Sequence, residues 1–207
     1  MDYRRIFRSA AVAYADLVSR VPGDRWESPA LGDWTLRDLV GHTAGSALRQ
    51  VPDVLGTPAP EVVVGAAEGF WAFARSVPAE TLEGFVAASG EDARATGRLL
   101  GDDPAGVIRE LAGRATHALA QVGDDDIVTT PVGGMRVREW LPTRTFELVV
   151  HGLDTAAAAG VPHGFVPEAL ADAASLAVRV AVAVGDGETL VRALTGRGEL
   201  PPGYSVV

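Results

Sequence analysis

Residues Trp140 to Asp154, with the sequence WLPTRTFELVVHGLD, decide the fold of this chain. No glycine or proline interrupts the stretch between Pro142 and Gly152, so it predicts one helix of about four turns. At 100° per residue, a mostly polar stripe runs down one side of this helix and an apolar flank lies beside it. The stripe consists of Trp140, Arg144, Glu147, His151 and Asp154, and the flank of Phe146, Val149, Val150 and Leu153.

Glu147 and His151 are four residues apart, so their side chains lie one above the other on the same face. A carboxylate and an imidazole in this arrangement can hold one divalent metal ion, and His42 on another predicted helix is the candidate third ligand. Such a set suits Zn²⁺, Ni²⁺, Fe²⁺ or Mn²⁺ and leaves a coordination position open for water or substrate. The alternative is a surface pair of Glu147 and His151, with His42 as an ordinary hydrogen-bonded residue.

The composition excludes several classes of protein. The chain has 207 residues, of which 47% are hydrophobic, so it predicts one domain, or one domain with a small appendage. The formal net charge of −9 argues against nucleic acids and membranes as partners, since both attract clustered basic residues. No apolar run is long enough for a membrane span or a signal peptide, and the sequence therefore predicts a soluble, cytoplasmic protein.

The chain has no cysteine, which removes disulfides, thiolate ligands and a protein-borne sulfur nucleophile. Any thiol chemistry therefore needs a thiol that arrives on a second substrate. The abundance of alanine, valine and glycine, with arginine as the main basic residue, is typical of proteins from GC-rich bacterial genomes.

Helical spacing of apolar residues recurs along most of the chain, and only one short hairpin is expected, around Val132-Gly133-Gly134. The economical fold is therefore an all-α helical bundle. Residues 51–60, with three prolines and a glycine, predict a connection, and the polar residues 89–102 have no assigned element. Helices are predicted over 2–21, about 36–49, 61–76, about 79–88, 103–123, 140–154, 167–184 and 188–195.

The helix that carries His42 has a clear start and an unusual interior. Thr35-Leu36-Arg37-Asp38 predicts a capping box, with aspartate in the place usually held by glutamate or glutamine. Gly41 and Gly45 flank His42, although a glycine inside a helix costs about 1 kcal/mol relative to alanine. Close approach of another backbone or a ligand would explain these glycines, and sequence drift in a glycine-rich chain is the alternative.

Other polar features carry less chemistry. The run Asp124–Asp126 lacks the spaced oxygen ligands of a calcium loop and predicts a polar turn. His117 could supply a fourth ligand, but a position on the helix surface is expected. His163 lies in a loop rich in proline and glycine and is expected to face solvent.

Two segments taken together resemble a known family. Residues 34–42, WTLRDLVGH, and residues 144–154, RTFELVVHGLD, resemble the signature segments of the mycothiol-dependent maleylpyruvate isomerase family, part of the DinB-like superfamily of helical metal proteins. The endings LTGR at 194–197 and LPPGYSV at 200–206 resemble those of actinobacterial members. Pro52–Asp102 carries no matching motif.

The resemblance implies a DinB-like four-helix bundle with additional short helices, as a single domain over 1–207 in which about 160–207 form a helical extension. It also implies a divalent metal, often zinc, on His42, Glu147 and His151, with mycothiol as a cosubstrate. The lack of cysteine fits a borrowed sulfur. The isomerase proper has a further C-terminal domain, so the resemblance leaves the isomerase reaction itself open.

The resulting hypothesis is a metal- and thiol-dependent transferase or isomerase acting on a small electrophile. A cation lowers the pKa of a thiol and holds it as the thiolate that attacks an electrophilic carbon. A metal-dependent hydrolase that activates water and a non-catalytic metal-containing protein that binds a small molecule are the alternatives. The substrate, the metal and the oligomeric state stay open, a homodimer included.

Residues beside the proposed ligands have two interpretations each. Arg144 could clamp a substrate carboxylate, although pairing with Glu147 or Asp154 is favoured. Asp154 could orient a ligand histidine from behind or contact a neighbouring loop. Trp34 and Trp140 could wall a pocket, but core packing is the expected role of both.

Overall fold

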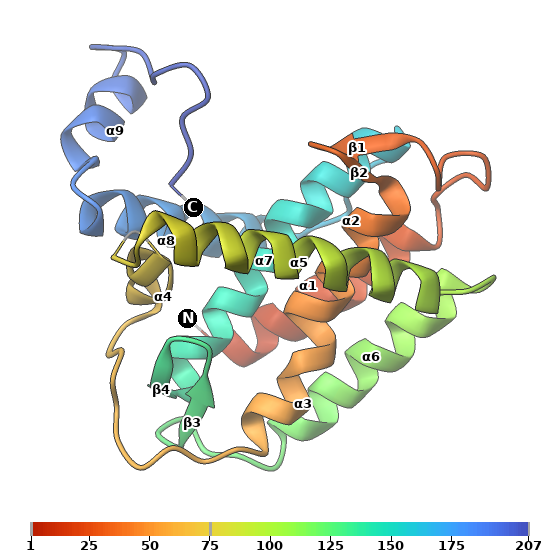
Figure 1. The fold of residues 1–207 in the computed structure, drawn as a ribbon, viewed down its shortest axis with the longest axis horizontal. Coiled ribbons are helices and arrows are strands. Elements are labelled where there is room, and N and C mark those ends of the chain that lie inside the picture. Colours follow the sequence, from red (N-terminus) through yellow and green to blue (C-terminus); the bar gives the residue numbers. More distant parts are fainter. Residues whose placement is uncertain (1, 75, 207) are drawn as a thin grey trace.

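The computed structural model describes residues 2–74 and 76–206, which are mostly helical with two small antiparallel hairpins (Figure 1). This confirms the predicted all-α, DinB-like fold. The helices are α1 (Tyr3–Val18), α2 (Leu36–Thr43), the π-helix η1 (Ala44–Arg49), α3 (Gln50–Leu55), α4 (Ala67–Ala74), α5 (Ala79–Leu99), α6 (Pro104–Leu119), α7 (Val137–Ala159), α8 (Pro167–Ala183) and α9 (Gly187–Leu194). The strands are β1 (Pro29–Leu31) with β2 (Trp34–Thr35), and β3 (Ile127–Thr130) with β4 (Gly133–Arg136).

The bundle consists of α1, α2 with η1, α6 and α7. α1 packs against α6 and α7, while α2 packs against α7 and η1 against α6. Large side chains fill the space between these helices, and Phe7, Tyr14, Leu39, Ile108 and Trp140 are at most 1% exposed. Each such burial stabilises the fold by about 1.5–3 kcal/mol, so the apolar stripes seen in the sequence account for the architecture.

Side chains cap the starts of three helices, and the capping box predicted at Thr35 is one of them. The carboxylate of Asp2 accepts a hydrogen bond from the first turn of α1. Thr35 and Asp38 form the complete capping box: the Thr35 hydroxyl accepts from the Asp38 N–H at 3.2 Å, and Asp38 accepts from the Thr35 N–H at 3.0 Å. Asp103 caps α6 in the same way at 2.8 Å. The capping box fixes the start of α2 and hence the direction in which His42 projects.

The helix predicted over 36–49 is α-helical only as far as Thr43 and continues as η1. It then passes directly into α3, so the prediction of a connection over 51–60 is wrong for residues 51–55. Pro52 therefore lies inside this continuous helical segment.

The segment between α3 and α6 differs most from the predictions. The helix predicted over 61–76 begins only at Ala67, and it includes Arg75, which lies outside the described residues. The short helix predicted over 79–88 and the unassigned residues 89–102 form one helix, α5, which ends at Leu99.

Contact between the backbones of α2 and α5 explains why glycine occurs in both helices. A Cβ atom on Gly41 would lie 2.4 Å from the carbonyl oxygen of Ala93 and 2.4 Å from the nitrogen of Gly97. A Cβ atom on Gly97 would in turn lie 2.9 Å from the carbonyl oxygen of Arg37. For Gly41, close approach of another backbone is therefore the correct explanation.

The β3–β4 hairpin and α8 pack against α7. The hairpin β3–β4 lies close to its predicted position and leads into α7, and α8 packs against both α7 and α4. α9 packs on α8 and is followed by the irregular tail from 195 to 206 (Figure 1). Among the described residues, no helix combines the length and apolar character that crossing a membrane requires.

Candidate metal centre

The polar stripe of α7 meets α2 inside the bundle. Glu147 Oε2 lies 3.5 Å from the Nε2 atom of His42 and 3.5 Å from the Nε2 atom of His151. The two imidazole rings are nearly perpendicular, at 88°, with their centroids 4.8 Å apart. The structure thus brings together the three side chains that the sequence singled out, from helices far apart in the chain.

The spacing of these three atoms fits a divalent metal ion. In a tetrahedral site with bonds of about 2.0–2.2 Å, neighbouring ligand atoms lie about 3.3–3.6 Å apart. Both histidine–glutamate distances fall in this range, and the three ligand atoms lie within 4.8 Å of one another. The side chains of His42, Glu147 and His151 are 17%, 15% and 18% exposed, so the centre is accessible and not sealed. Metal binding by this cluster stays a prediction.

The outer nitrogen of each imidazole has a polar neighbour. Nδ1 of His151 lies 3.2 Å from Asp154 Oδ2, and Nδ1 of His42 lies 3.3 Å from the Ser89 hydroxyl on α5. Metal-binding histidines usually donate their outer N–H to such a group, which fixes the ring and its tautomer. In both rings Nε2 is then left to face the centre.

The π-helix η1 supports Glu147. Ser46 donates a hydrogen bond from its hydroxyl to Glu147 Oε2 at 3.1 Å. The carbonyl of Ser46 accepts hydrogen bonds from Arg144 Nη1 at 2.8 Å and from the side-chain amide of Gln50. π-Helical turns often occur at functional sites, and here the turn connects the buried guanidinium of Arg144 to the carboxylate of Glu147.

The family comparison agrees with this geometry. Residues 7–156 match the family model described as mycothiol maleylpyruvate isomerase N-terminal domain, and this range includes His42, Glu147 and His151. The chain belongs to this family. No curated protein and no solved structure matches it.

Charge in this isomerase-family centre is set by neighbouring side chains. Burial would raise the pKa of the Glu147 carboxyl group, but the contact with His42 and the positive charge of Arg144 hold the pKa at about 2. Burial would lower the pKa of His151, but the hydrogen bond to Asp154 and the charges of Glu147 and Asp154 outweigh it and raise the pKa. A metal ion therefore meets an ionised carboxylate, and it competes with a proton for His151.

Arg144 does not form the ion pair that was favoured from the sequence. Among the described residues no ion pair joins it to Glu147 or Asp154, because its guanidinium is occupied by the Ser46 carbonyl and by the Thr143 hydroxyl at 2.9 Å. The side chain is 3% exposed and lies over the ring of Phe70, 4.7 Å from its centroid. Nη2 has no hydrogen-bond partner within the described part of the chain.

The two tryptophans that flank the signature segments differ in environment. Trp140 is completely buried among core side chains, which agrees with the expected role in packing. Trp34 is half-buried, and its ring lies 4.9 Å from the ring of His42. Trp34 is therefore a wall of the centre and not only a core residue.

Sequence reasoning missed Ser46 and Ser89. The position of Ser46 could have been recognised, since it follows His42 by four residues and so shares a helix face with it. No local signal points to Ser89, because only the packing of α5 on α2 brings it near. Of the other histidines, His117 is exposed on α6, and His163 is half-buried where solvent exposure was expected; neither joins the centre.

Proposed function

We propose that this protein holds one divalent metal ion on His42, Glu147 and His151 and uses it to activate a thiol for attack on a small electrophile. Mycothiol is the first candidate for the thiol, and the reaction is a transfer or an isomerisation. The observation that carries the proposal is the position of Glu147 Oε2, 3.5 Å from both histidine Nε2 atoms in an accessible centre. The family description, which names mycothiol and an isomerase, supports the same chemistry.

The division of labour follows from charge. A divalent cation supplies the positive charge that holds a thiol as thiolate near neutral pH. Glu147 balances part of this charge, whereas neutral imidazoles balance none. The chain contains no cysteine, so the sulfur has to come from a second substrate. Zinc suits two imidazoles and one carboxylate, as do nickel, iron and manganese.

The neighbouring polar residues are assigned positioning roles. Asp154 orients His151 through Nδ1, and Ser89 does the same for His42. Arg144 holds the carbonyl of Ser46 and, through Ser46, the carboxylate of Glu147. A substrate carboxylate could reach the buried guanidinium only if the ring above it moved, so a direct clamp is disfavoured.

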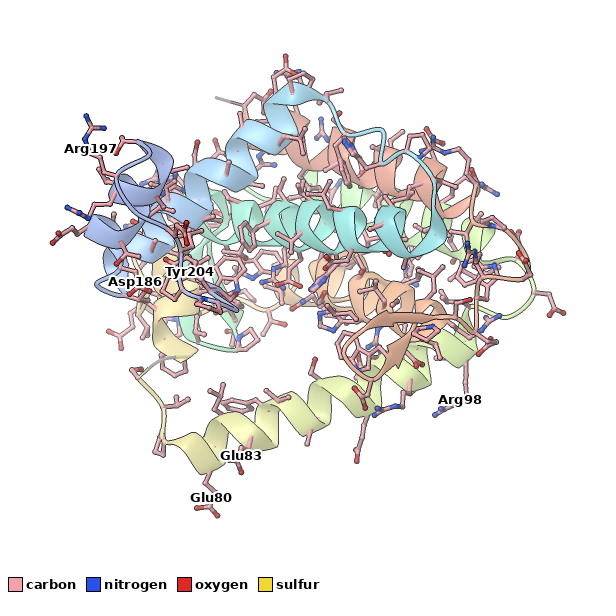
Figure 2. The ribbon with its side chains drawn as sticks, turned by 90° about the horizontal axis from the view of Figure 1, so that it is seen from above. Glu80, Glu83, Arg98, Asp186, Arg197 and Tyr204 are labelled. Carbon is pink, nitrogen blue, oxygen red and sulfur yellow. The ribbon has the colours of Figure 1, made fainter. Side chains whose placement is uncertain are left out.

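An apolar path leads toward the centre along α5. Leu82, Phe85, Val86 and Ser89 recur at helical spacing and so share one face, and Ser89 contacts His42. The first three are 39%, 58% and 65% exposed, which is unusual for such large apolar side chains on one face. Glu80 projects from α5 away from the rest of the molecule, so the apolar face lies on the opposite side of the helix (Figure 2). Leu82 and Phe85 on this face suit an electrophile with an apolar part.

Metal content tests the ligand assignment. Protein purified without chelator is expected to contain close to one equivalent of divalent metal by elemental analysis, and His42→Ala or His151→Ala is expected to lose most of it. His117→Ala is the matched control, because this histidine is exposed on α6 and should leave the metal content unchanged. Equal metal in all four proteins contradicts the assignment.

A thiol and electrophile screen tests the reaction. Metal-loaded protein is mixed with an electrophile and either mycothiol or no thiol, and the loss of free thiol and of electrophile is followed. Consumption that requires the thiol and disappears in His151→Ala supports the proposal. Thiol-independent hydrolysis, or saturable binding without turnover, overturns it in favour of a hydrolase or a binding protein respectively.

A further inference from the structure

A pocket of about 340 Å³ lies beside the metal centre, next to Trp34. One wall comes from the β1–β2 hairpin and the other from α5, on which Ser89 contacts His42. The pocket and the centre therefore share Trp34 and neighbouring positions of α5. The volume lies within the range of about 300–1,000 Å³ that is usual for small-molecule sites. The lining residues are Leu31, Asp33, Trp34, Val86, Ala87, Gly90 and Arg94.

The lining of the pocket combines apolar and aromatic surface with one ion pair. Leu31, Trp34 and Val86 offer apolar and aromatic surface. Asp33 and Arg94 form an ion pair of 2.5 Å, and their side chains are 78% and 42% exposed. The ion pair thus presents hydrogen-bond acceptors and donors to solvent with no net charge.

This combination selects against several ligand types. An anion attracted by Arg94 would be repelled by Asp33, and a cation attracted by Asp33 would be repelled by Arg94, so the paired charges favour neither kind of ion. A purely apolar group would have to remove water from both charges without replacing its hydrogen bonds, which is costly. A neutral, polyhydroxylated ring satisfies every part of the pocket, because its C–H face can lie on the indole while its hydroxyl groups bond to the carboxylate and the guanidinium.

We propose that this pocket receives the polyhydroxylated, sugar-like part of the thiol cosubstrate, while the sulfur reaches the centre past Trp34. The inference rests on the proposed function, since it needs a thiol that binds at the centre. Mycothiol has the required composition: an acetylated cysteine joined to a glucosamine and an inositol ring. The pocket then predicts a preference for this thiol over a small thiol with the same reactive group.

Thiol binding to cobalt-substituted protein tests the subsite. A thiolate on cobalt gives a sulfur-to-metal charge-transfer absorption, so titration yields a dissociation constant for mycothiol and one for N-acetylcysteine, which lacks the two rings. Wild-type protein is expected to bind mycothiol at least ten times more tightly. Arg94→Gln is expected to weaken mycothiol binding about tenfold, because charge-assisted hydrogen bonds are lost, and to leave N-acetylcysteine unchanged.

Arg98→Gln is the matched control, because Arg98 is exposed on the same helix and projects away from the body of the molecule (Figure 2). The thiol-free glucosaminyl-inositol should compete with mycothiol and not with N-acetylcysteine. Equal affinities of the two thiols for wild type, or equal losses of both in Arg94→Gln, overturn the subsite while the proposed function stands. Absence of the charge-transfer absorption with either thiol overturns thiol binding itself.

Discussion

The two sides of the metal centre are built by different means. On the α7 side, Glu147, His151 and Asp154 are three or four residues apart in one helix, so local geometry alone aligns them. On the other side, His42 has its outer nitrogen beside Ser89 from α5, and this contact exists only because the backbones of α2 and α5 touch. The α7 side is therefore set by sequence spacing, whereas the α2–α5 side depends on tertiary packing and is the more vulnerable of the two.

The largest expected effect on stability comes from the substitution Gly41→Ala, which disrupts the contact between α2 and α5. The added Cβ atom would meet backbone atoms of α5 at 2.4 Å, and backbone cannot rotate away as a side chain can. Overpacking costs about 1–3 kcal/mol or more, against a gain of about 1 kcal/mol in helix propensity. We expect the free energy of unfolding to fall by about 2 kcal/mol in urea denaturation, with weaker metal binding as Ser89 moves from His42.

Gly113→Ala provides the control for this prediction. Gly113 also lies inside a helix, α6, but a Cβ atom there would meet nothing within 4 Å. The substitution is expected to raise the free energy of unfolding by up to about 1 kcal/mol. If both variants are stabilised alike, the backbone contact between α2 and α5 is not tight and the comparison fails.

The next largest effect compares the residues behind the two histidines. Asp154→Asn removes a carboxylate from His151, and such changes weaken metal binding about 10–100-fold. The lower end, about tenfold, is expected, because Asp154 is 35% exposed and its charge is partly screened. Ser89→Ala removes only a neutral hydroxyl at 3.3 Å from His42 and should change affinity by less than that. Competition with a chromophoric chelator measures both, and a larger loss in Ser89→Ala reverses the assignment of the stronger support.

The contrast between local spacing in α7 and tertiary packing of α2 on α5 also explains which features could be predicted from the sequence. The helix over 140–154, its stripe and the capping box at Thr35 depend on residues close together in the chain, and all three were predicted correctly. The contact between His42 and Glu147 was inferred from the family resemblance and from the tendency of helical bundles to form metal sites between facing helices. No local sequence pattern predicts it. Geometry alone then shows that their atoms approach to 3.5 Å.

Other features could not be predicted from the sequence, because they depend on contacts with segments far away in the chain. The helical pattern of α5 is obscured by Gly90 and Gly97, and the glycine at 97 is explained only by its contact with the Arg37 backbone of α2. The π-helix η1 carries no local signature, since its Ser46 carbonyl is bonded by Arg144 from a helix far along the chain. Ion pairing of Arg144 was predicted from spacing, but its Nη1 donates to the Ser46 carbonyl and its Nε to the Thr143 hydroxyl instead.

A smaller effect on stability is expected from a substitution of Tyr14, which lies in the core between α2 and α7. Its hydroxyl is completely buried beside the hydroxyls of Thr43 on α2 and Thr155 on α7, outside regular hydrogen-bond geometry, and burial raises its pKa to about 12. Thr155 also donates to the carbonyl of His151 at 2.6 Å. Tyr14→Phe is expected to cost about 1 kcal/mol of stability or less and to leave metal affinity unchanged. Chemical denaturation and a chelator competition check the two parts, and a marked loss of affinity assigns Tyr14 to the centre.

The smallest effect is the pH dependence of stability, and it distinguishes the metal-free from the metal-loaded protein. In metal-free protein the raised pKa of His151 stabilises the fold below about pH 6.5, and this contribution is lost as the pH rises through the raised value. The lowered pKa of Glu147, about 2, stabilises the fold above about pH 4.5, and this is lost as the pH falls toward 2. For these two groups the metal-free protein is therefore most stable between about pH 4.5 and 6.5.

The stabilisation that the metal provides should increase as the pH rises above about 6.5, because the ion binds only the neutral form of His151. The gap in melting temperature between loaded and chelator-treated protein is thus expected to widen steadily from about pH 5 to about pH 8. Asp154→Asn should shift this widening to lower pH, since it removes a cause of the raised pKa, while Ser89→Ala should not. A gap that stays constant over the range would mean that no histidine gives up a proton to the metal, and the difference between the two sides of the centre would then have no chemical consequence.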